Sequence, residues 1–229
     1  MLDITILTLF PEMFPGHLGL SLAGKGLSKE VWKYRAVNIR DYALDKHKKV
    51  DDTPYGGGAG MLMKPDVVDR AIINNHKSDA LLINLSPRGK LLNQDLVKEI
   101  YNASNITLLC GHYEGIDQRV LDKHNCLDVS VGDYILSGGE IAALTLMDAL
   151  VRLVPEVMGG GEETLKEESF NDGLLEYPQY TKPYDFEGMK VPEILLSGHH
   201  ENIKKWRYEK SQEITKERRP DLWEKYKIN

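Results

Sequence analysis

The chain has 229 residues, of which 41% are hydrophobic and 28% are charged, and its formal net charge is −6 at pH 7. This length is sufficient for one large domain or for a domain with a smaller companion, and the composition is ordinary for a globular protein. No uncharged apolar run approaches the roughly 20 residues that a bilayer requires, and the first residues lack the basic start of a signal peptide. We therefore expect a cytoplasmic protein with no membrane partner.

The cysteines and the charge distribution further limit the classes of protein to which the chain can belong. Cys110 and Cys126 provide neither a disulfide framework nor a CxxC metal spacing, so two reduced thiols are expected. The net charge does not indicate a nucleic-acid-binding protein, but basic residues gather between positions 199 and 219, with Trp206 and Tyr208 among them. Two interpretations fit this segment: a solvated helix face, or a surface that contacts phosphates.

Strand-like and helix-like segments alternate along the first 130 or so residues. Pro65 suits a first helical turn, and Asn93 can cap the helix that follows it. Such alternation predicts an α/β fold, with a parallel sheet and flanking crossover helices. The predicted strands are Asp3–Leu9, Arg35–Ile39, Ala80–Leu85, Ile106–Cys110 and Leu127–Val131, and the predicted helices are Pro65–His76, Gln94–Ala103 and Ile116–His124.

A further helix is predicted over Glu140–Val154, and it is apolar on almost every side. A helix of this kind must be covered on every face, either in the centre of the domain or against a second subunit. Asp148 and Arg152 lie four residues apart in the order that favours an ion pair along the helix.

The chain changes character after Pro155. Three consecutive glycines and an acidic run follow, and then prolines spaced through an irregular stretch, before a helical pattern returns near His199. We predict an α/β domain over residues 1–158, a flexible linker over 159–176, and a small, mainly helical domain over 177–229.

Three glycine-bearing loops follow predicted strands. They are Leu85–Gly89, Cys110–Asp117 and Ser130–Glu140, the last of which joins a strand to the apolar helix. Ligands of open parallel sheets collect at the carboxyl ends of the strands, so these loops predict one ligand pocket. Tyr55–Met61 has four glycines but does not complete a dinucleotide fingerprint, and both a surface loop and a ligand loop remain open for it.

Seven motifs, in this order, resemble those of the bacterial tRNA (guanine-N1)-methyltransferases, which act at position 37 and belong to the SPOUT superfamily. The resemblance implies a deep trefoil knot in the C-terminal part of the α/β domain, a homodimer, and S-adenosyl-methionine as the methyl donor. The motifs are TLFPEMF (Thr8–Phe14), PYGGGAGM (Pro54–Met61), LSPRG (Leu85–Gly89), LLCGHYEGID (Leu108–Asp117), SVGDYILSGGE (Ser130–Glu140), ESFNDGLLEYPQYTKP (Glu168–Pro183) and VPEILLSGHH (Val191–His200).

The resemblance also implies which residues bind the donor. The adenine and the ribose would rest on Leu85–Gly89, Gly111 and Val131–Leu136. Tyr113, Glu114 and Gly139 would lie near the methionine end. A divalent ion such as Mg cannot be read from the sequence, and no metal ligand is implied. The implied donor-binding residues are Leu85, Ser86, Pro87, Gly89, Gly111, Tyr113, Glu114, Val131, Gly132, Asp133, Tyr134, Ile135, Leu136, Gly138 and Gly139.

Methylation at N1 of guanine requires a base, because N1 carries a proton at neutral pH. The family places an aspartate in a D-S-F motif for this purpose, and this chain has Glu168 at that position, with Glu167 as an alternative. Arg152 corresponds to the arginine that holds the guanine and offsets charge on its O6. His112 stands where some relatives have an arginine, and we assign it no role.

The basic C-terminal segment would hold the anticodon stem-loop of the tRNA through its phosphates. Two other functions stay open: another SPOUT RNA methyltransferase, and a non-catalytic RNA-binding relative, which the change from aspartate to Glu168 favours. A dinucleotide oxidoreductase lacks its glycine fingerprint here.

Overall fold

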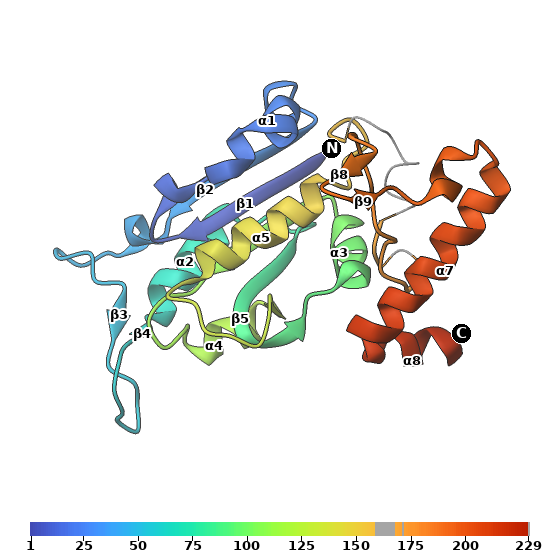
Figure 1. Cartoon of the computed structure of the whole chain (residues 1–229). Helices are drawn as coiled ribbons and strands as arrows, with labels where there is room; N and C mark the ends of the chain where they lie inside the picture. The colour runs from blue at the N-terminus through green and yellow to red at the C-terminus, as the bar shows by residue number, and fades with distance from the viewer. Residues whose placement is uncertain (159–167, 171, 229) are drawn as a thin grey trace. The chain divides into compact units, whose positions relative to one another are not determined.

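The computed structural model describes residues 1–158, 168–170 and 172–228 of the chain. The chain divides into two compact units, Met1–Gly159 and Gly160–Asn229. They run from blue to yellow and from orange to red in Figure 1. Within the described ranges, no helix has the length and apolar character needed to span a membrane.

The first unit contains a five-stranded sheet with the order β2-β1-β6-β5-β7, in which every neighbouring pair is parallel. The predicted α/β fold with a parallel sheet is therefore confirmed, and each of the five predicted strands is present. β2 begins before the predicted Arg35 because Trp32 already pairs with Leu2. The strands are β1 (Leu2–Thr8), β2 (Trp32–Asn38), β5 (Leu81–Leu91), β6 (Asn105–Cys110) and β7 (Leu127–Ser130), and a separate ribbon is formed by β3 (Asp51–Asp52) and β4 (Leu62–Met63).

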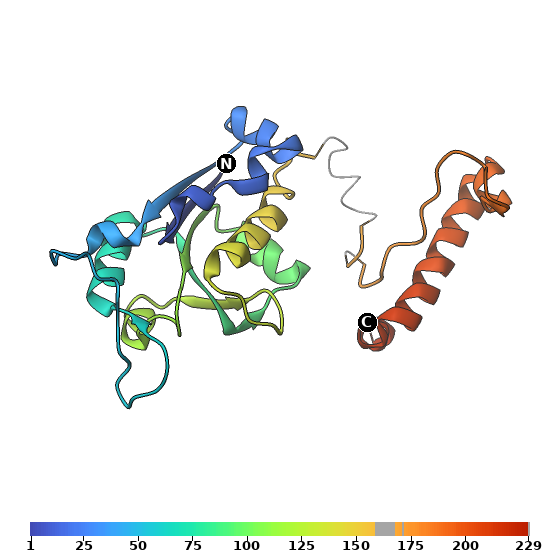
Figure 2. The same ribbon diagram turned by 60° about the vertical axis from the view of Figure 1, so that its left-hand side comes forward.

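Helices cover both faces of this sheet, as Figures 1 and 2 show. The side chain of Asn93 caps α3 by accepting from Leu96 N, and that of Asp117 caps α4 by accepting from Arg119 N. The helices are α1 (Ser21–Ser28), α2 (Pro65–Asn75), α3 (Gln94–Tyr101), α4 (Gln118–Lys123) and α5 (Gly139–Val151), with short 3-10 turns at Pro11–Met13, Gly16–Gly19 and Ile39–Tyr42.

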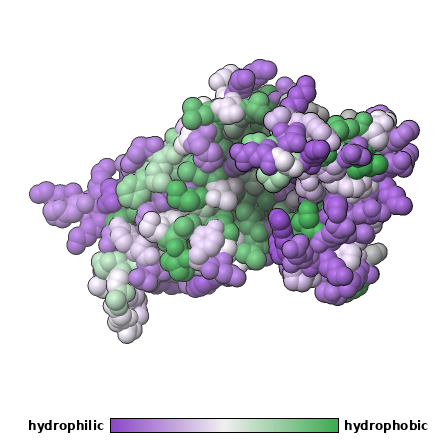
Figure 3. All heavy atoms as spheres, in the orientation of Figure 1, coloured by the Kyte–Doolittle hydropathy of each residue, from purple (hydrophilic) through white to green (hydrophobic). Residues whose placement is uncertain are grey.

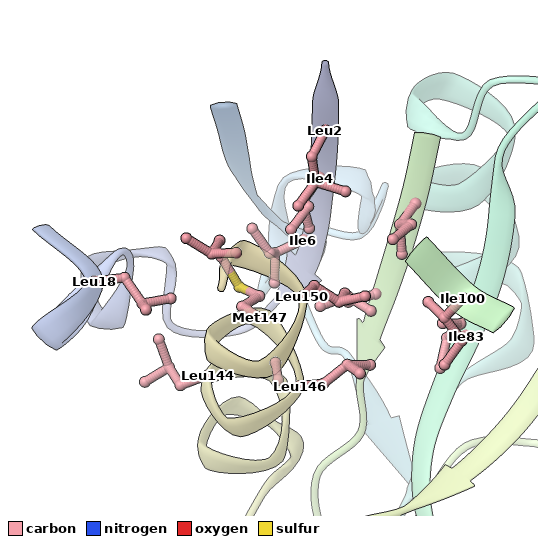
Figure 4. Packing of buried hydrophobic residues seen from close by; sticks show 14 of the residues in the cluster. Leu2, Ile4, Ile6, Leu18, Ile83, Ile100, Leu144, Leu146, Met147 and Leu150 are labelled. Atoms are coloured by element: carbon pink, nitrogen blue, oxygen red, sulfur yellow. The ribbon is translucent and has the colours of Figure 1, made fainter. Parts of the chain in front are cut away.

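Alternate residues of β1, β5 and β6 enter two different hydrophobic clusters, as the pleat of a strand requires. Ile4 and Ile6 of β1 pack with α3 and α5, whereas Leu7 of the same strand packs with α2 and α4. Figure 4 shows Met147 and Leu150 of α5 beside Ile6. Because both faces are buried, the strands are apolar along most of their length, which is the pattern that identified them in the sequence.

α5 lies across one face of the sheet, and the first unit alone covers most of it. Its buried residues include Ala143, Leu146 and Leu150, whereas Ile141 is 50% exposed. The prediction that the helix requires extensive cover is thus met largely within one unit. The helix ends before the predicted Val154 because the last turn changes to i→i−3 hydrogen bonds.

The second unit is mainly helical, and an irregular segment lies against its long helix. Leu175 N donates to Thr215 Oγ1 at 2.8 Å, and the Arg207 guanidinium lies 4.7 Å from the ring centre of Tyr177. The trefoil knot and the limits of the domains and the linker stay predictions. The elements are β8 (Asp185–Phe186), β9 (Met189–Lys190), a 3-10 turn (Glu193–Leu196), α7 (His200–Arg218) and α8 (Pro220–Ile228).

Candidate functional site

The first of the three predicted loops is a bulge inside β5 and not a turn after it. Leu85 and Lys90 both pair with Val129, so that the residues between them leave the ladder while the strand continues to Leu91. A β-carbon on Gly89 would collide with the backbone of Asp128 and Val129, and the close approach of β7 therefore requires glycine here. The expectation of a strand that ends at Leu85 is wrong, because pairing with β7 resumes beyond the bulge.

The second and third loops are joined to each other by the backbone. Gly139 N donates to Gly111 O at 2.9 Å, and His112 forms an isolated antiparallel bridge with Gly138. A β-carbon on Gly139 would lie 2.7 Å from Cys110 Cα, so the start of α5 can pass the end of β6 only without a side chain.

The glycine-rich loop over Tyr55–Met61 approaches the second loop. Glu114 N donates to Met61 O at 2.9 Å, and Met63 N donates to Gly115 O at the same distance. The two interpretations of this loop, an exposed surface loop and part of a ligand site, both remain open, because its tip is exposed and its base is bonded to a pocket segment.

The three loops surround one cavity of about 250 Å³, beside the bulge in β5 and at the carboxyl ends of β6 and β7. Its lining combines peptide groups, hydroxyls, one carboxylate and apolar side chains, which is the mixture that binds a small organic ligand with a polar edge. The lining residues are Asn84, Leu85, Ser86, Pro87, Arg88, Gly111, His112, Tyr113, Glu114, Gly115, Ile116, Val129, Ser130, Val131, Gly132, Tyr134, Ile135, Leu136, Ser137, Gly138, Gly139 and Ala142.

The structure brings all but two of the implied donor-binding residues around this cavity. Gly89 lies under β7 and Asp133 is exposed, and neither lines the cavity. Sequence reasoning left out nine lining residues: Asn84, Arg88, His112, Gly115, Ile116, Val129, Ser130, Ser137 and Ala142. All of them except Asn84, Val129 and Ala142 lie inside the quoted motifs, so the whole motifs, extended by one or two residues, would have included them.

A buried carboxylate contacts His112, one of the residues that line the cavity. Glu140 is 2% exposed and lies in the first turn of α5. Thr8 Oγ1 donates to its Oε1 at 2.6 Å, and His112 Nε2 lies 2.7 Å from its Oε2. Burial, together with the nearby Glu140 carboxylate, raises the pKa of the Cys110 thiol well above its ordinary value, so Cys110 stays a neutral core residue.

The two implied catalytic residues belong to different units. Arg152 follows the last turn of α5 in the first unit, where Asp148 Oδ1 lies 3.8 Å from His17 Nε2. Glu168 belongs to the second unit, whereas every residue around the cavity belongs to the first. Glu167, the alternative base, lies outside the described residues.

The two described residues that follow Glu168 are hydrogen-bonded within the second unit. Glu176 N donates to Ser169 Oγ at 2.9 Å, and Phe170 N donates to Leu174 O at 2.8 Å. Because Leu174 is buried, this turn presents Glu168 from a defined piece of backbone in the second unit.

The fold and the cavity define an α/β protein with a small-molecule site at the carboxyl edge of a parallel sheet. Comparison with known proteins gives its family: residues 2–225 match the tRNA (Guanine-1)-methyltransferase TrmD family. The chain belongs to this family, which is a member of the SPOUT class, and the resemblance seen in the motifs is confirmed.

Curated relatives match over almost their whole length. The chain is 56% identical to the tRNA (guanine-N(1)-)-methyltransferase of Rhodospirillum rubrum, over 98% of this chain and 94% of the relative. It is 51% identical to the protein of the same name from Pelagibacter ubique, over the full length of both chains. The corresponding protein of Bartonella henselae is 52% identical over 98% of this chain and 96% of the relative.

Proposed function

We propose that the protein transfers a methyl group from S-adenosyl-methionine to N1 of the guanosine at position 37 of tRNA, in the cytoplasm. The observation that carries the proposal is the convergence of three loops on one cavity, in a chain whose relatives are named for guanine-N1 methylation of tRNA. The cavity supplies a site for the donor, and the names of the relatives supply the target atom.

The cavity fits the donor chemically. Leu85, Ile135, Leu136 and Ala142 provide apolar surface for a flat heterocycle, and the backbone of the lining loops provides peptide groups for its edge. Glu114, at the same cavity, is the carboxylate available to an amino group or to a sulfonium charge. When bound, S-adenosyl-methionine supplies the methyl group.

Two side chains carry the proton and the charge of the reaction. The Glu168 carboxylate accepts the N1 proton as the N1–carbon bond forms and the carbon–sulfur bond breaks, so that the methylated ring leaves neutral. Arg152 faces the charge that develops on O6 of the guanine. Since Glu168 and Arg152 lie in different units, catalysis requires the second unit to come to the site, in the same subunit or in a partner.

The second unit supplies a surface for the tRNA. α7 has a very polar sequence, and its exposed side chains include Lys204, Lys205, Lys216 and Arg218. Trp206 of this helix and Tyr180 lie with ring centres 6.3 Å apart. Cations that neutralise phosphates, with aromatic rings between them, are typical of a surface that binds a folded RNA strand.

A homodimer is part of the proposal. Apolar atoms lie exposed on the face of the first unit that carries α5 (Figure 3). Ile141 of α5 is 50% exposed, and Leu20, which directly follows the 3-10 turn Gly16–Gly19 that contacts α5, is 70% exposed. Exposed apolar side chains gathered in this way mark a surface that a second copy can cover.

The test is to incubate the protein with labelled donor and unmodified tRNA and to identify the labelled nucleoside. We expect 1-methylguanosine at position 37 and no product when adenosine replaces that guanosine. Label on another base or on a ribose would indicate another RNA methyltransferase. Donor binding without transfer to any RNA would indicate a non-catalytic relative.

A further inference from the structure

The opening motif Thr8–Phe14 has no part in the proposed chemistry, yet the structure connects it to the cavity. Thr8 is the last residue of β1 and is fully buried. Its hydroxyl donates to Glu140 and accepts from Phe10 N at 2.9 Å. The orientation of the hydroxyl is thus fixed by one hydrogen bond that it donates and one that it accepts, and it holds one carboxylate oxygen of Glu140 in place.

The other oxygen of Glu140 holds His112. An ionised carboxylate only accepts, so the 2.7 Å contact places a proton on His112 Nε2. A carboxylate this deeply buried is stabilised when all its oxygens are hydrogen-bonded, and here Thr8 and His112 satisfy one oxygen each, at the favourable N-terminal end of α5.

The ring of His112 fills the space between two pocket loops. It packs on one side against Phe10, with ring centres 5.1 Å apart. On another side it occupies the position that a β-carbon of Gly138 would take. His112 itself lines the cavity, directly before Tyr113 and Glu114.

We propose that Glu140 is a positioning residue: anchored by Thr8, it fixes the His112 ring and through it the Gly111–Gly115 loop against the methyl donor. The inference rests on the proposed function, because it assumes that the cavity holds S-adenosyl-methionine. It assigns His112 a direct place at the donor and Glu140 an indirect one.

The first unit contains a matched control. His124 Nε2 lies 2.6 Å from Asp69 Oδ1, a second carboxylate–imidazole pair, between α2 and the end of α4. Neither residue lines the cavity. Loss of this pair removes a similar interaction and leaves the donor site untouched.

The test is calorimetric titration of the full chain with S-adenosyl-methionine, for Glu140→Ala, His112→Ala and the double variant. We expect each single change to raise Kd about tenfold and the double variant to be no weaker than the singles, because Glu140 acts through His112. Glu140→Gln, whose amide oxygen still accepts from Nε2, should stay within about threefold of the parent, and Asp69→Ala should leave Kd unchanged.

Two further measurements make the outcome decisive. Nitrogen-15 spectra of the ligand-free chain should show His112 protonated at Nε2, and Glu140→Ala should abolish that preference. Should Glu140→Ala fail to fold, Thr8→Val takes its place in the cycle, since it removes the hydroxyl that anchors the carboxylate.

Each result has one meaning. Losses that add, to about a hundredfold in the double variant, would overturn the inference, as would an unchanged Kd in Glu140→Ala. Absence of binding by the parent chain would instead reject the donor site, and with it both the proposed function and this inference.

Discussion

The two units of this protein are stabilised in different ways. In the first unit, apolar residues fill two clusters on opposite faces of a parallel sheet, and three loops leave the sheet at one edge. In the second unit, α7 buries only Ser211 and Thr215 among its described residues, and α8 buries none. The proposed donor site requires a rigid backbone, whereas the proposed RNA surface requires exposed charges, and the two kinds of packing suit these two roles.

The largest effect is expected where the two units must cooperate. Glu168→Gln keeps the shape of the side chain and removes the base, so turnover should fall about 10²–10⁴-fold. Donor affinity, which depends on the first unit, should not change. Single-turnover methylation of tRNA and donor titration measure the two quantities, and near-normal turnover would reject Glu168 as the base and direct attention to Glu167.

A somewhat smaller loss is expected from the first unit's contribution to the chemical step. Arg152→Ala removes the cation that we propose faces O6, and the rate of the chemical step should fall about 10²–10³-fold. Arg152→Lys should recover part of it. Rapid-quench kinetics at saturating tRNA and donor separate this loss from weaker binding; a change in affinity alone would show that Arg152 only holds the substrate.

Stability provides a third way to compare the units. Leu150 is fully buried in α5, and Leu150→Ala should destabilise the first unit by about 2–5 kcal/mol through the cavity it leaves. Thr215→Val should destabilise the second unit by about 1–3 kcal/mol, because Leu175 N loses its buried acceptor.

The tryptophans can report the two transitions separately. Trp32 lies in the first unit and Trp206 and Trp223 lie in the second. Urea unfolding followed by fluorescence, in the parent chain and in Trp32→Phe, should show each substitution shifting only its own unit. Equal shifts of both signals would mean that the units unfold together.

The smallest effect concerns the RNA surface. Affinity for tRNA should fall with salt, and Lys204→Ala should lower the slope of log K against log salt by about 0.7–0.9, the share of one phosphate contact. Lys29→Ala removes the same charge from the first unit and should leave the slope unchanged. Filter binding at several salt concentrations measures both, and an equal change in the two variants would contradict a phosphate-binding role specific to α7.

Much of the fold could be predicted because its determinants are local. β-branched runs such as Ile4–Leu7 identified the strands, and Pro65 and Asn93 identified helix starts. The bulge in β5 could not be predicted, since it depends on Val129 of β7 pairing with Leu85 on one side of the bulge and with Lys90 on the other. Pairing between distant segments produces no periodic pattern of residues in the sequence of either segment.

The candidate site shows the same limit. The motifs named most of the cavity lining, but they gave His112 no role and did not connect Thr8 with Glu140. Thr8 and Glu140 are 132 positions apart in the sequence, and only the fold brings them within hydrogen-bonding distance.

The sequence by itself determined the fold class and the family of this protein, through its strand and helix pattern and its motifs. It also showed that basic residues gather in one C-terminal helix although the net charge of the chain is negative. Local propensity and the identity of motif residues are written in neighbouring positions, so they can be read without coordinates. Only the tertiary structure decided which loops share a cavity, which glycines the packing of backbones requires, and where a buried carboxylate finds its partners. Those facts depend on distances between segments that are far apart in the chain. Burial of apolar side chains and pairing of strands determine these distances.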